Sequence, residues 1–146
     1  MFVYLTAGTN ETFDVSAYSY KVANFPVTSD KRWGWTVVEA HLHGLLELSN
    51  FIIKKMLYRS VQEFVVCTSS SLIQKICDTD YLYDLQKNSW KSQDGAPLFH
   101  VPLLKELYYH KLFYKERDVN WSILTELGET EYRQYELCTD RLKQIL

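Results

Sequence analysis

The sequence predicts an α/β domain with a mixed sheet, and two features of the residue pattern carry this prediction. Strand-like segments fill the first 35 residues, and after them helical and strand-like segments alternate to the end of the chain. A chain of 146 residues buries roughly 70% of the surface that its unfolded form exposes. We therefore expect one domain over residues 1–146, with a core that needs neither disulfides nor metal ions.

Three strands are expected at the start of the chain. Residues 2–5 form a short apolar run that is stopped by Gly8 and Asn10, which is typical of a buried strand. Residues 13–22 alternate between two sets of side chains, and this period of two indicates a second strand. Pro26 favours a strand edge or a turn, so the third strand is expected beyond it, at residues 32–35.

Helices and strands alternate in the rest of the chain. From Thr36 the apolar residues recur with the helical period, which predicts a helix of about twenty residues. Residues 64–67 form a short apolar strand, and the hydroxyl side chains of residues 68–71 suit the start of the next helix. A strand, helix, strand order implies parallel pairing. The remaining elements are expected to be a short helix at 80–86, a polar loop at 88–97, a helix at 103–113, a strand at 119–124 and a last helix at 131–146.

Charge and hydropathy exclude several classes of protein. Sixteen basic against 18 acidic side chains give a formal net charge of -2, so no global attraction to nucleic acid is expected. No run of about 18 apolar residues exists, which argues against a membrane span. The first five residues lack the basic region and the long apolar core of a signal peptide, so we expect an intracellular protein, cytoplasmic or nuclear. Three cysteines without CxxC spacing argue against a disulfide framework or a zinc site.

Three local motifs and the order of the elements resemble type I ribonuclease H. Thr6-Ala7-Gly8-Thr9, at the end of the first strand, is similar to the Thr-Asp-Gly-Ser motif of that family. Glu39 lies one turn into the long helix, where the family has its second acid. Cys67-Thr68-Ser69-Ser70 resembles the Thr-Asp-Ser at the end of the family's fourth strand.

Later segments extend the resemblance over nearly the whole chain. Lys87-Asn88-Ser89-Trp90-Lys91-Ser92 is close to the Lys-Asn-Gly-Trp-Lys-Thr of the basic protrusion in the cellular enzymes. Residues 97–107 follow it as the family's next helix does, Val119-Asn120-Trp121 resembles the strand after that, and Asp140-Arg141-Leu142 resembles the final Asp-x-Leu. The resemblance implies a ribonuclease H-like fold, with a five-stranded mixed sheet flanked by helices.

The same resemblance implies a degenerate catalytic site. The family hydrolyses the RNA strand of RNA/DNA hybrids with two divalent metal ions held by four carboxylates, because hard cations prefer anionic oxygen ligands. The four positions fall on Ala7, Glu39, Ser69 and Asp140, so two of the four acids are absent. A methyl group offers no lone pair, and a neutral hydroxyl is a poor ligand for Mg²⁺. We therefore expect neither a bound metal ion nor another cofactor.

Other departures from the family pattern affect substrate recognition. The stretch at residues 126–129 holds no His, although the family's mobile loop carries one before the last helix. Residues 35–38 are mostly apolar, whereas the family places polar side chains there against the RNA 2′-hydroxyls. Residues 10–12 replace the family's Gly-rich turn. Recognition of hybrids is therefore affected as well as their cleavage.

Histidines, a cysteine and several acids are further candidates for a site. His41 and His43 stand two apart on a helix and do not share a face, which argues against a metal site, and Cys67 is interpreted as core. Several acids could rebuild a metal site, but we interpret them as solvated loop residues: Glu11, Asp14, Glu126, Glu129 and Glu131.

Basic residues concentrate between Lys87 and Arg117. The candidates for nucleic-acid binding are Lys87, Trp90 and Lys91, since phosphates attract lysines and bases stack on aromatic rings. A solvated basic face is the alternative, and the sequence leaves both open. Likewise, the eleven Tyr residues suit either a core or a binding surface.

The function expected from these observations is that of a catalytically inactive ribonuclease H-like domain. It would act as a scaffold for a protein partner, within an RNA-processing or nucleic-acid-associated complex. One alternative is an active or weakly active ribonuclease H that uses Glu39, Asp140 and Mg²⁺. The other is a module that binds RNA or RNA/DNA hybrid without cleaving it.

Overall fold

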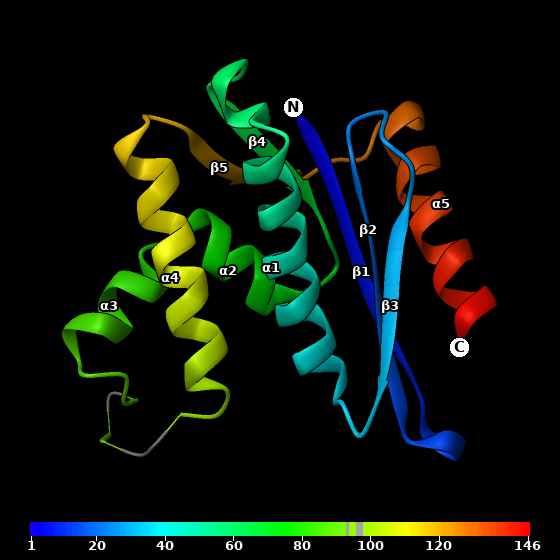
Figure 1. Cartoon of the computed structure of the whole chain (residues 1–146), viewed down its shortest axis with the longest axis horizontal. Coiled ribbons are helices and arrows are strands. Elements are labelled where there is room, and N and C mark those ends of the chain that lie inside the picture. Colours follow the sequence, from blue (N-terminus) through cyan, green and yellow to red (C-terminus); the bar gives the residue numbers. More distant parts are fainter. Residues whose placement is uncertain (93, 96–97) are drawn as a thin grey trace.

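Five strands form one sheet in the order β3-β2-β1-β4-β5 in the computed structural model, which describes residues 1–92, 94–95 and 98–146 (Figure 1). Strand β1 pairs antiparallel with β2, and β2 pairs antiparallel with β3. Strand β4 pairs parallel with both β1 and β5. This arrangement confirms the predicted mixed sheet. The strands are β1 (Phe2–Asn10), β2 (Val15–Val22), β3 (Thr28–Trp33), β4 (Glu63–Cys67) and β5 (Asn120–Ile123).

Helices cover both faces of the sheet. Helix α1 packs on β1 and β2 from one side together with α2 and α4, whereas α5 packs on β1, β2 and β3 from the other (Figure 1). No helix within the described parts of the chain is both long and apolar enough to cross a bilayer. The helices are α1 (Val37–Lys54), α2 (Ser71–Asp78), α3 (Tyr81–Lys87), α4 (Val101–Glu116) and α5 (Glu129–Ile145).

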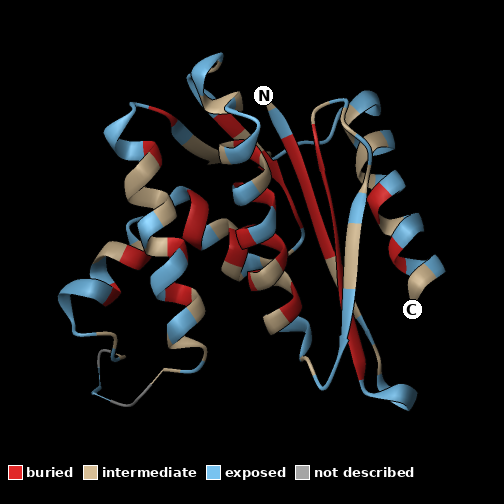
Figure 2. Ribbon diagram, viewed as in Figure 1, coloured by how far each residue is buried: buried red, intermediate tan, exposed pale blue. Residues whose placement is uncertain are grey.

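Strand β1 sends alternate side chains into two hydrophobic clusters. Val3 and Leu5 belong to the main cluster beneath α1, while Tyr4 packs with Cys67 and Cys138 beneath α5. Both faces of β1 and β2 are therefore covered, and Figure 2 shows buried residues along these two strands. This explains why all eight residues of β2 are buried although their chemistry alternates.

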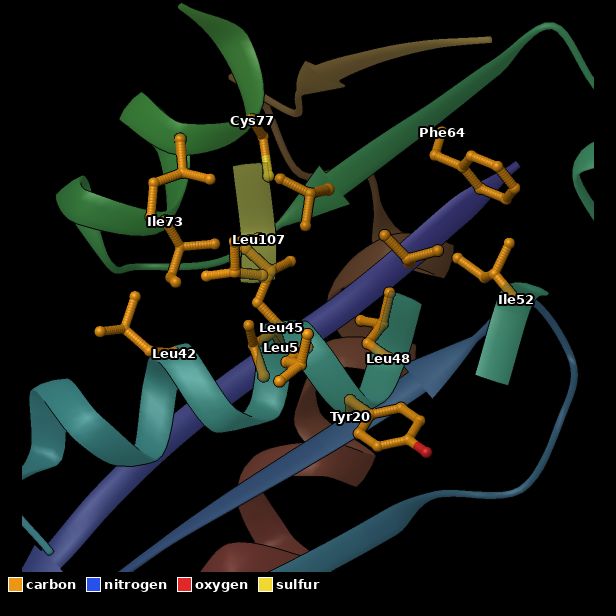
Figure 3. Packing of buried hydrophobic residues seen from close by; sticks show 14 of the residues in the cluster. Leu5, Tyr20, Leu42, Leu45, Leu48, Ile52, Phe64, Ile73, Cys77 and Leu107 are labelled. Carbon is orange, nitrogen blue, oxygen red and sulfur yellow. The ribbon is translucent and has the colours of Figure 1, made fainter. Parts of the chain in front are cut away.

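The main cluster joins α1 to the sheet and to the smaller helices, as Figure 3 shows. Phe64 of β4 is fully buried and lies with ring centroids 5.0 Å from Trp121 and 5.9 Å from Tyr114. Many of the aromatic side chains thus serve the core.

Two predicted strand boundaries are wrong. Strand β1 does not end before Gly8, because its hairpin with β2 continues to the Asn10–Val15 pair, so Ala7 lies inside the strand. The third strand spans Thr28–Trp33 and not residues 32–35, since Gly34, with a φ of +79°, turns the chain towards α1. As an edge strand of polar residues, it lacks the alternation that would have revealed it.

The helical predictions are confirmed within a few residues. Helix α1 begins after Thr36 and α5 ends at Ile145, close to the predicted limits. The predicted helix at 103–113 is longer, because α4 starts at Val101 and runs to Glu116. The segment at 97–107, which resembles a helix of the ribonuclease H family, begins at residue 97, and this residue lies outside the described residues.

The close approach of α1 to the sheet gives a testable prediction. A Cβ added at Gly44 would lie 2.7 Å from Leu5 Cδ1 and 2.9 Å from Tyr18 Cβ. Alanine favours an isolated helix by about 1 kcal/mol over glycine, but overpacking costs about 1–3 kcal/mol, so Gly44→Ala should lower the free energy of unfolding. Urea unfolding measures the change. Asn50→Ala, at an exposed position of the same helix, is the control and should not destabilise the protein. A Gly44→Ala protein more stable than wild type would contradict this close packing.

Candidate functional site

Ala7 lies in the interior of β1, at the position that corresponds to the family's first acid. It pairs with Tyr18 across the hairpin, and its half-buried methyl group packs against the main hydrophobic cluster. The side chain therefore contributes apolar contact at this point of the sheet and has no atom that can hold a cation.

Ser69 follows the end of β4 and is held by α5. Its Oγ accepts a hydrogen bond from the hydroxyl of Tyr135, at an O–O distance of 3.4 Å. The flanking residues begin α2, because Ser70 Oγ caps the helix by accepting the Ile73 amide at 3.2 Å. Sequence reasoning did not find the role of Tyr135, since nothing in the pattern of α5 distinguishes it from a core aromatic residue.

Glu39 is part of the N-terminal cap of α1. Its backbone amide donates to Thr36 Oγ1 at 3.1 Å, and its carboxylate accepts the Thr36 amide at 3.2 Å. These two bonds form a capping box, which satisfies backbone donors that the first turn of a helix leaves unpaired. The only acid retained at the first three positions is thus bound to the start of its own helix.

Asp140 is exposed on α5 and points away from the sheet. The residues of this helix that are buried against the sheet are Cys138 and Leu142. Asp140 is two residues from each, and two residues correspond to about 200° of helical rotation. The structure therefore does not direct this carboxylate towards Ser69 or Ala7.

The donor set at these four positions does not fit a pair of magnesium ions. Two hard cations need several anionic oxygens at one point. Here the four positions supply a methyl group, a hydroxyl group, a capping carboxylate and an outward-facing carboxylate. Within residues 1–92, 94–95 and 98–146, no group of three or more His, Cys, Asp or Glu side chains is arranged to hold a metal ion.

The two histidines of α1 have different environments. His41 Nδ1 lies 3.1 Å from the Val37 carbonyl oxygen, whereas its Nε2 is buried without a hydrogen-bond partner in the described structure. Burial lowers the pKa of His41, which favours the neutral imidazole. His43 instead stacks on Trp35, with ring centroids 4.3 Å apart.

The acids before and within α5 are exposed or half-buried, and the charge of one of them affects Cys67 in the smaller hydrophobic cluster beneath α5. Glu129 is exposed and pairs with Arg133 at 2.7 Å. Glu131 is half-buried, and its charge adds to the effect of burial in raising the pKa of Cys67 to about 11. Cys67 is therefore a buried, protonated thiol at neutral pH, as its interpretation as core requires. Cys77 and Cys138 are likewise free and buried.

The candidate basic region contains a connected group of aromatic rings. Tyr108 of α4 lies 5.6 Å from Trp90 and 5.8 Å from Tyr83 between ring centroids, and 5.6 Å from Tyr109. Lysines lie over these rings, with Lys105 Nζ 5.9 Å from the Trp90 centroid. We call this group of four rings and their lysines the lysine–aromatic face. Lys105 and Lys115 lie over rings of this group, and we include the exposed Lys87 and Lys91, which are near Trp90 along the chain.

Exposure separates the lysines of this region into two kinds. Lys87 and Lys91 are exposed, and Trp90 between them is half-buried in a left-handed backbone conformation with a φ of 60°. Lys111, by contrast, donates to the carbonyl oxygens of Ile76 and Thr79, each at 2.5 Å. Its ammonium group caps the end of α2, so Lys111 is a structural residue and not part of the exposed face.

The fold is that of ribonuclease H, as comparison with solved structures shows. The solution structure of the prototype foamy virus ribonuclease H domain matches with a TM-score of 0.67 and 11% identity, covering 98% of this chain and 90% of that one. The ribonuclease H1 isolated from compost by a metagenomic approach matches with a TM-score of 0.58 and 13% identity, covering 99% and 96%. No family model and no curated protein matches the sequence.

A larger viral protein contains the same fold as one part. The foamy viral protease-reverse transcriptase, solved in complex with an RNA/DNA hybrid, matches with a TM-score of 0.66 and 15% identity. The match covers 98% of this chain and 19% of that protein. At these identities, the comparisons establish the ribonuclease H-like fold of this chain.

Proposed function

We propose that this protein is a catalytically inactive ribonuclease H-like domain that acts as a docking scaffold for another protein. The observation that carries the proposal is the structural role of three of the four positions that the resemblance assigns to catalysis. Ala7 packs in the core, Ser69 bonds to Tyr135, and the carboxylate of Glu39 caps α1. None of these three positions keeps a free carboxylate for a metal ion.

The chemistry of hydrolysis supports this proposal. Two-metal hydrolysis depends on cations that activate water and stabilise the leaving oxygen. At this site, such cations would lack both the bridging carboxylate at position 7 and the carboxylate at position 69. Desolvation of a divalent cation beside a methyl group is unfavourable, because no ligand replaces the lost water.

An exposed aromatic pair supports the scaffold role. Trp33 is 72% exposed and Phe13 is 59% exposed, at the end of the sheet where the β1–β2 hairpin meets the start of α1. Their segments are joined, since the Gly34 amide donates to the Asp14 carbonyl at 2.7 Å. Large exposed aromatic side chains are typical anchors of protein interfaces. We name Phe13 and Trp33 the hairpin-end aromatics.

The first prediction concerns catalysis. With Mg²⁺ or Mn²⁺, the purified protein should cleave RNA/DNA hybrid no faster than buffer, because the donor set cannot assemble two cations. Release of labelled fragments measures this, with an active ribonuclease H1 as the positive control. The control variant is Glu106→Gln, on the exposed side of α4. Inactivity would be disproved if the protein cleaved the hybrid and if Glu39→Gln, but not Glu106→Gln, abolished this cleavage.

The second prediction concerns the partner. Replacing both hairpin-end aromatics by Ser should reduce recovery of a co-purifying protein from the native cell by at least about tenfold, since interface aromatics contribute about 2 kcal/mol or more each. Quantitative mass spectrometry of the purified complex measures recovery. Tyr132→Ser, at a 53% exposed position of α5, is the matched control and should change nothing. Equal recovery with both variants would exclude this surface, and no recovery even with wild type would contradict the scaffold role.

The lysine–aromatic face favours nucleic-acid contact as a second function. Lysine ammonium groups attract phosphates, and exposed rings such as Tyr109, which is 66% exposed, offer stacking surfaces for bases. Two of the structures that share the fold were solved with RNA/DNA hybrids. Because the net charge is -2, attraction to phosphates would have to be local.

The third prediction follows from this face. Affinity for RNA/DNA hybrid should fall steeply with salt, and Lys87→Ala with Lys91→Ala should lower the slope of log K against log salt by about 0.9 per lost phosphate contact. Fluorescence anisotropy across a salt series measures the slope. The charge-matched control is Lys54→Ala with Lys55→Ala, at the C-terminal end of α1. This double variant should leave the slope unchanged. Identical slopes for both double variants would exclude the face.

A further inference from the structure

Strand β3 is an open edge of the sheet. Strand β2 pairs with it on one side, and no strand in the described parts of the chain lies on its other side (Figure 1). The residues of β3 are half-buried or exposed along its whole length. An unpaired edge of this kind presents a row of backbone donors and acceptors to another chain.

The hydrogen bonds between β2 and β3 determine which backbone groups of β3 face outwards. The Gly34 amide donates to the carbonyl of Asp14, which lies opposite it at the end of the β2–β3 pair. In an antiparallel pair, hydrogen-bonded and non-hydrogen-bonded positions alternate along the strands. Counting back from Gly34, the residues that direct their N–H and C=O groups away from β2 are Ser29, Lys31 and Trp33.

The side chains of Asp30 and Arg32 share one face of β3 and carry opposite charges. Arg32 Nε lies 3.5 Å from Asp30 Oδ2, and the two side chains are 65% and 45% exposed. Asp30 Oδ1 also accepts the outward amide of Lys31 at 2.8 Å. Because an exposed ion pair contributes little to stability, the Asp30 carboxylate can exchange Arg32 for another cation at little cost.

Two copies of β3 complement each other in one antiparallel register. With Lys31 opposite Lys31 of the second copy, Asp30 lies opposite Arg32 of the second copy, and the reverse pair forms as well. Every outward residue then has a hydrogen-bonding partner, because Ser29 lies opposite Trp33 of the second copy. A shift of two residues in either direction would leave one outward residue unpaired and would place two Asp30 or two Arg32 side chains opposite each other. Opposite charges are favourable in such cross-strand pairs and like charges are not, so the charges select the register.

The other side chains of the strand are compatible with this register. Trp33 is 72% exposed, and the small side chain of Ser29 leaves room for its ring across the pair. Lys31 Nζ donates to the carbonyl of Ile145, at the end of α5, at a distance of 2.9 Å. Each Lys31 ammonium group is thus held by the helix of its own copy, which separates the two like charges.

The helices on both faces of the sheet leave room for a second copy. Helices α1 and α5 pack mainly on β1 and β2, so they lie back from the β3 edge. Neighbouring strands lie about 4.8 Å apart, so the same helix in the two copies would lie about 19 Å apart. Packed helices approach each other to about 8–10 Å, and the two copies therefore do not collide.

We propose that the protein forms a symmetric dimer through β3, in which the two five-stranded sheets join into one continuous sheet. The partner is a second copy of this chain, because β3 is its own complement in hydrogen bonding, in charge and in side-chain size. A two-fold axis requires such a self-complementary surface. This inference is independent of the scaffold role, and its tests leave Phe13 and Trp33 unchanged.

Sedimentation velocity of the full chain tests the dimer. The sedimentation coefficient should rise with protein concentration, as expected for a monomer and a dimer in equilibrium. A monomer at every concentration up to about 1 mM, where even a weak specific contact is half-saturated, would overturn the proposal.

Charge variants test the register. Asp30→Arg and Arg32→Asp should each raise the dissociation constant of the dimer by about tenfold or more, because each turns two attractive pairs into repulsive ones. The double variant, Asp30→Arg with Arg32→Asp, restores opposite charges and should return the constant to within about threefold of wild type. Arg59→Asp, at an exposed position between α1 and β4, is the matched control and should not change it. Single variants that dimerise like wild type, or a double variant that does not recover, would overturn the proposal.

Cysteine cross-linking measures the register directly. Lys31→Cys places two thiols opposite each other, with Cα atoms about 5.5 Å apart, which lies within the range of a disulfide. Oxidised glutathione should therefore convert this variant into a covalent dimer. Thr28→Cys is the control, because its two thiols would lie about 20 Å apart along the strands. The native cysteines are buried. Equal cross-linking of the two variants, or of neither, would overturn this pairing.

Discussion

The burial of β1 on both faces is the constraint on which the rest of the structure depends. Leu5 faces α1, and Gly8 faces α5, where an added Cβ would lie 3.1 Å from Leu142 Cδ2. A shift of one residue would exchange the two sets of side chains and expose each to the wrong layer. The register of β1 therefore determines where position 7 lies, and it places Ala7 against the main cluster.

The four positions that the resemblance assigns to catalysis have different surroundings in this structure. Four carboxylates gathered at one point repel one another unless cations neutralise them. The described structure avoids that repulsion, because its retained acids are separated: Glu39 caps its own helix, and Asp140 faces solvent. Tyr135 reaches Ser69 with a hydroxyl group that needs no counter-ion.

The parts of the fold with a clear period were predictable from the sequence, and the polar parts were not. Apolar residues recur with the helical period over the eighteen residues of α1, so this helix was predicted correctly. The edge strand β3 lacks alternation of polar and apolar residues, and its position was predicted wrongly. At the site, residue identity predicted the loss of carboxylates at positions 7 and 69. No pattern predicted that Lys111 caps α2, or that His41 and Trp121 have buried nitrogens without partners among the described residues, because these depend on neighbours far along the chain.

The sequence by itself determined the order of strands and helices, the α/β class and the absence of carboxylates at positions 7 and 69, because periodicity and residue type are local properties. Only the tertiary structure decided how that chemistry is used. It brings Tyr135 to Ser69 and joins the rings around Tyr108 into one face. Such contacts arise when the layers pack around β1, since packing brings together side chains that no sequence spacing relates.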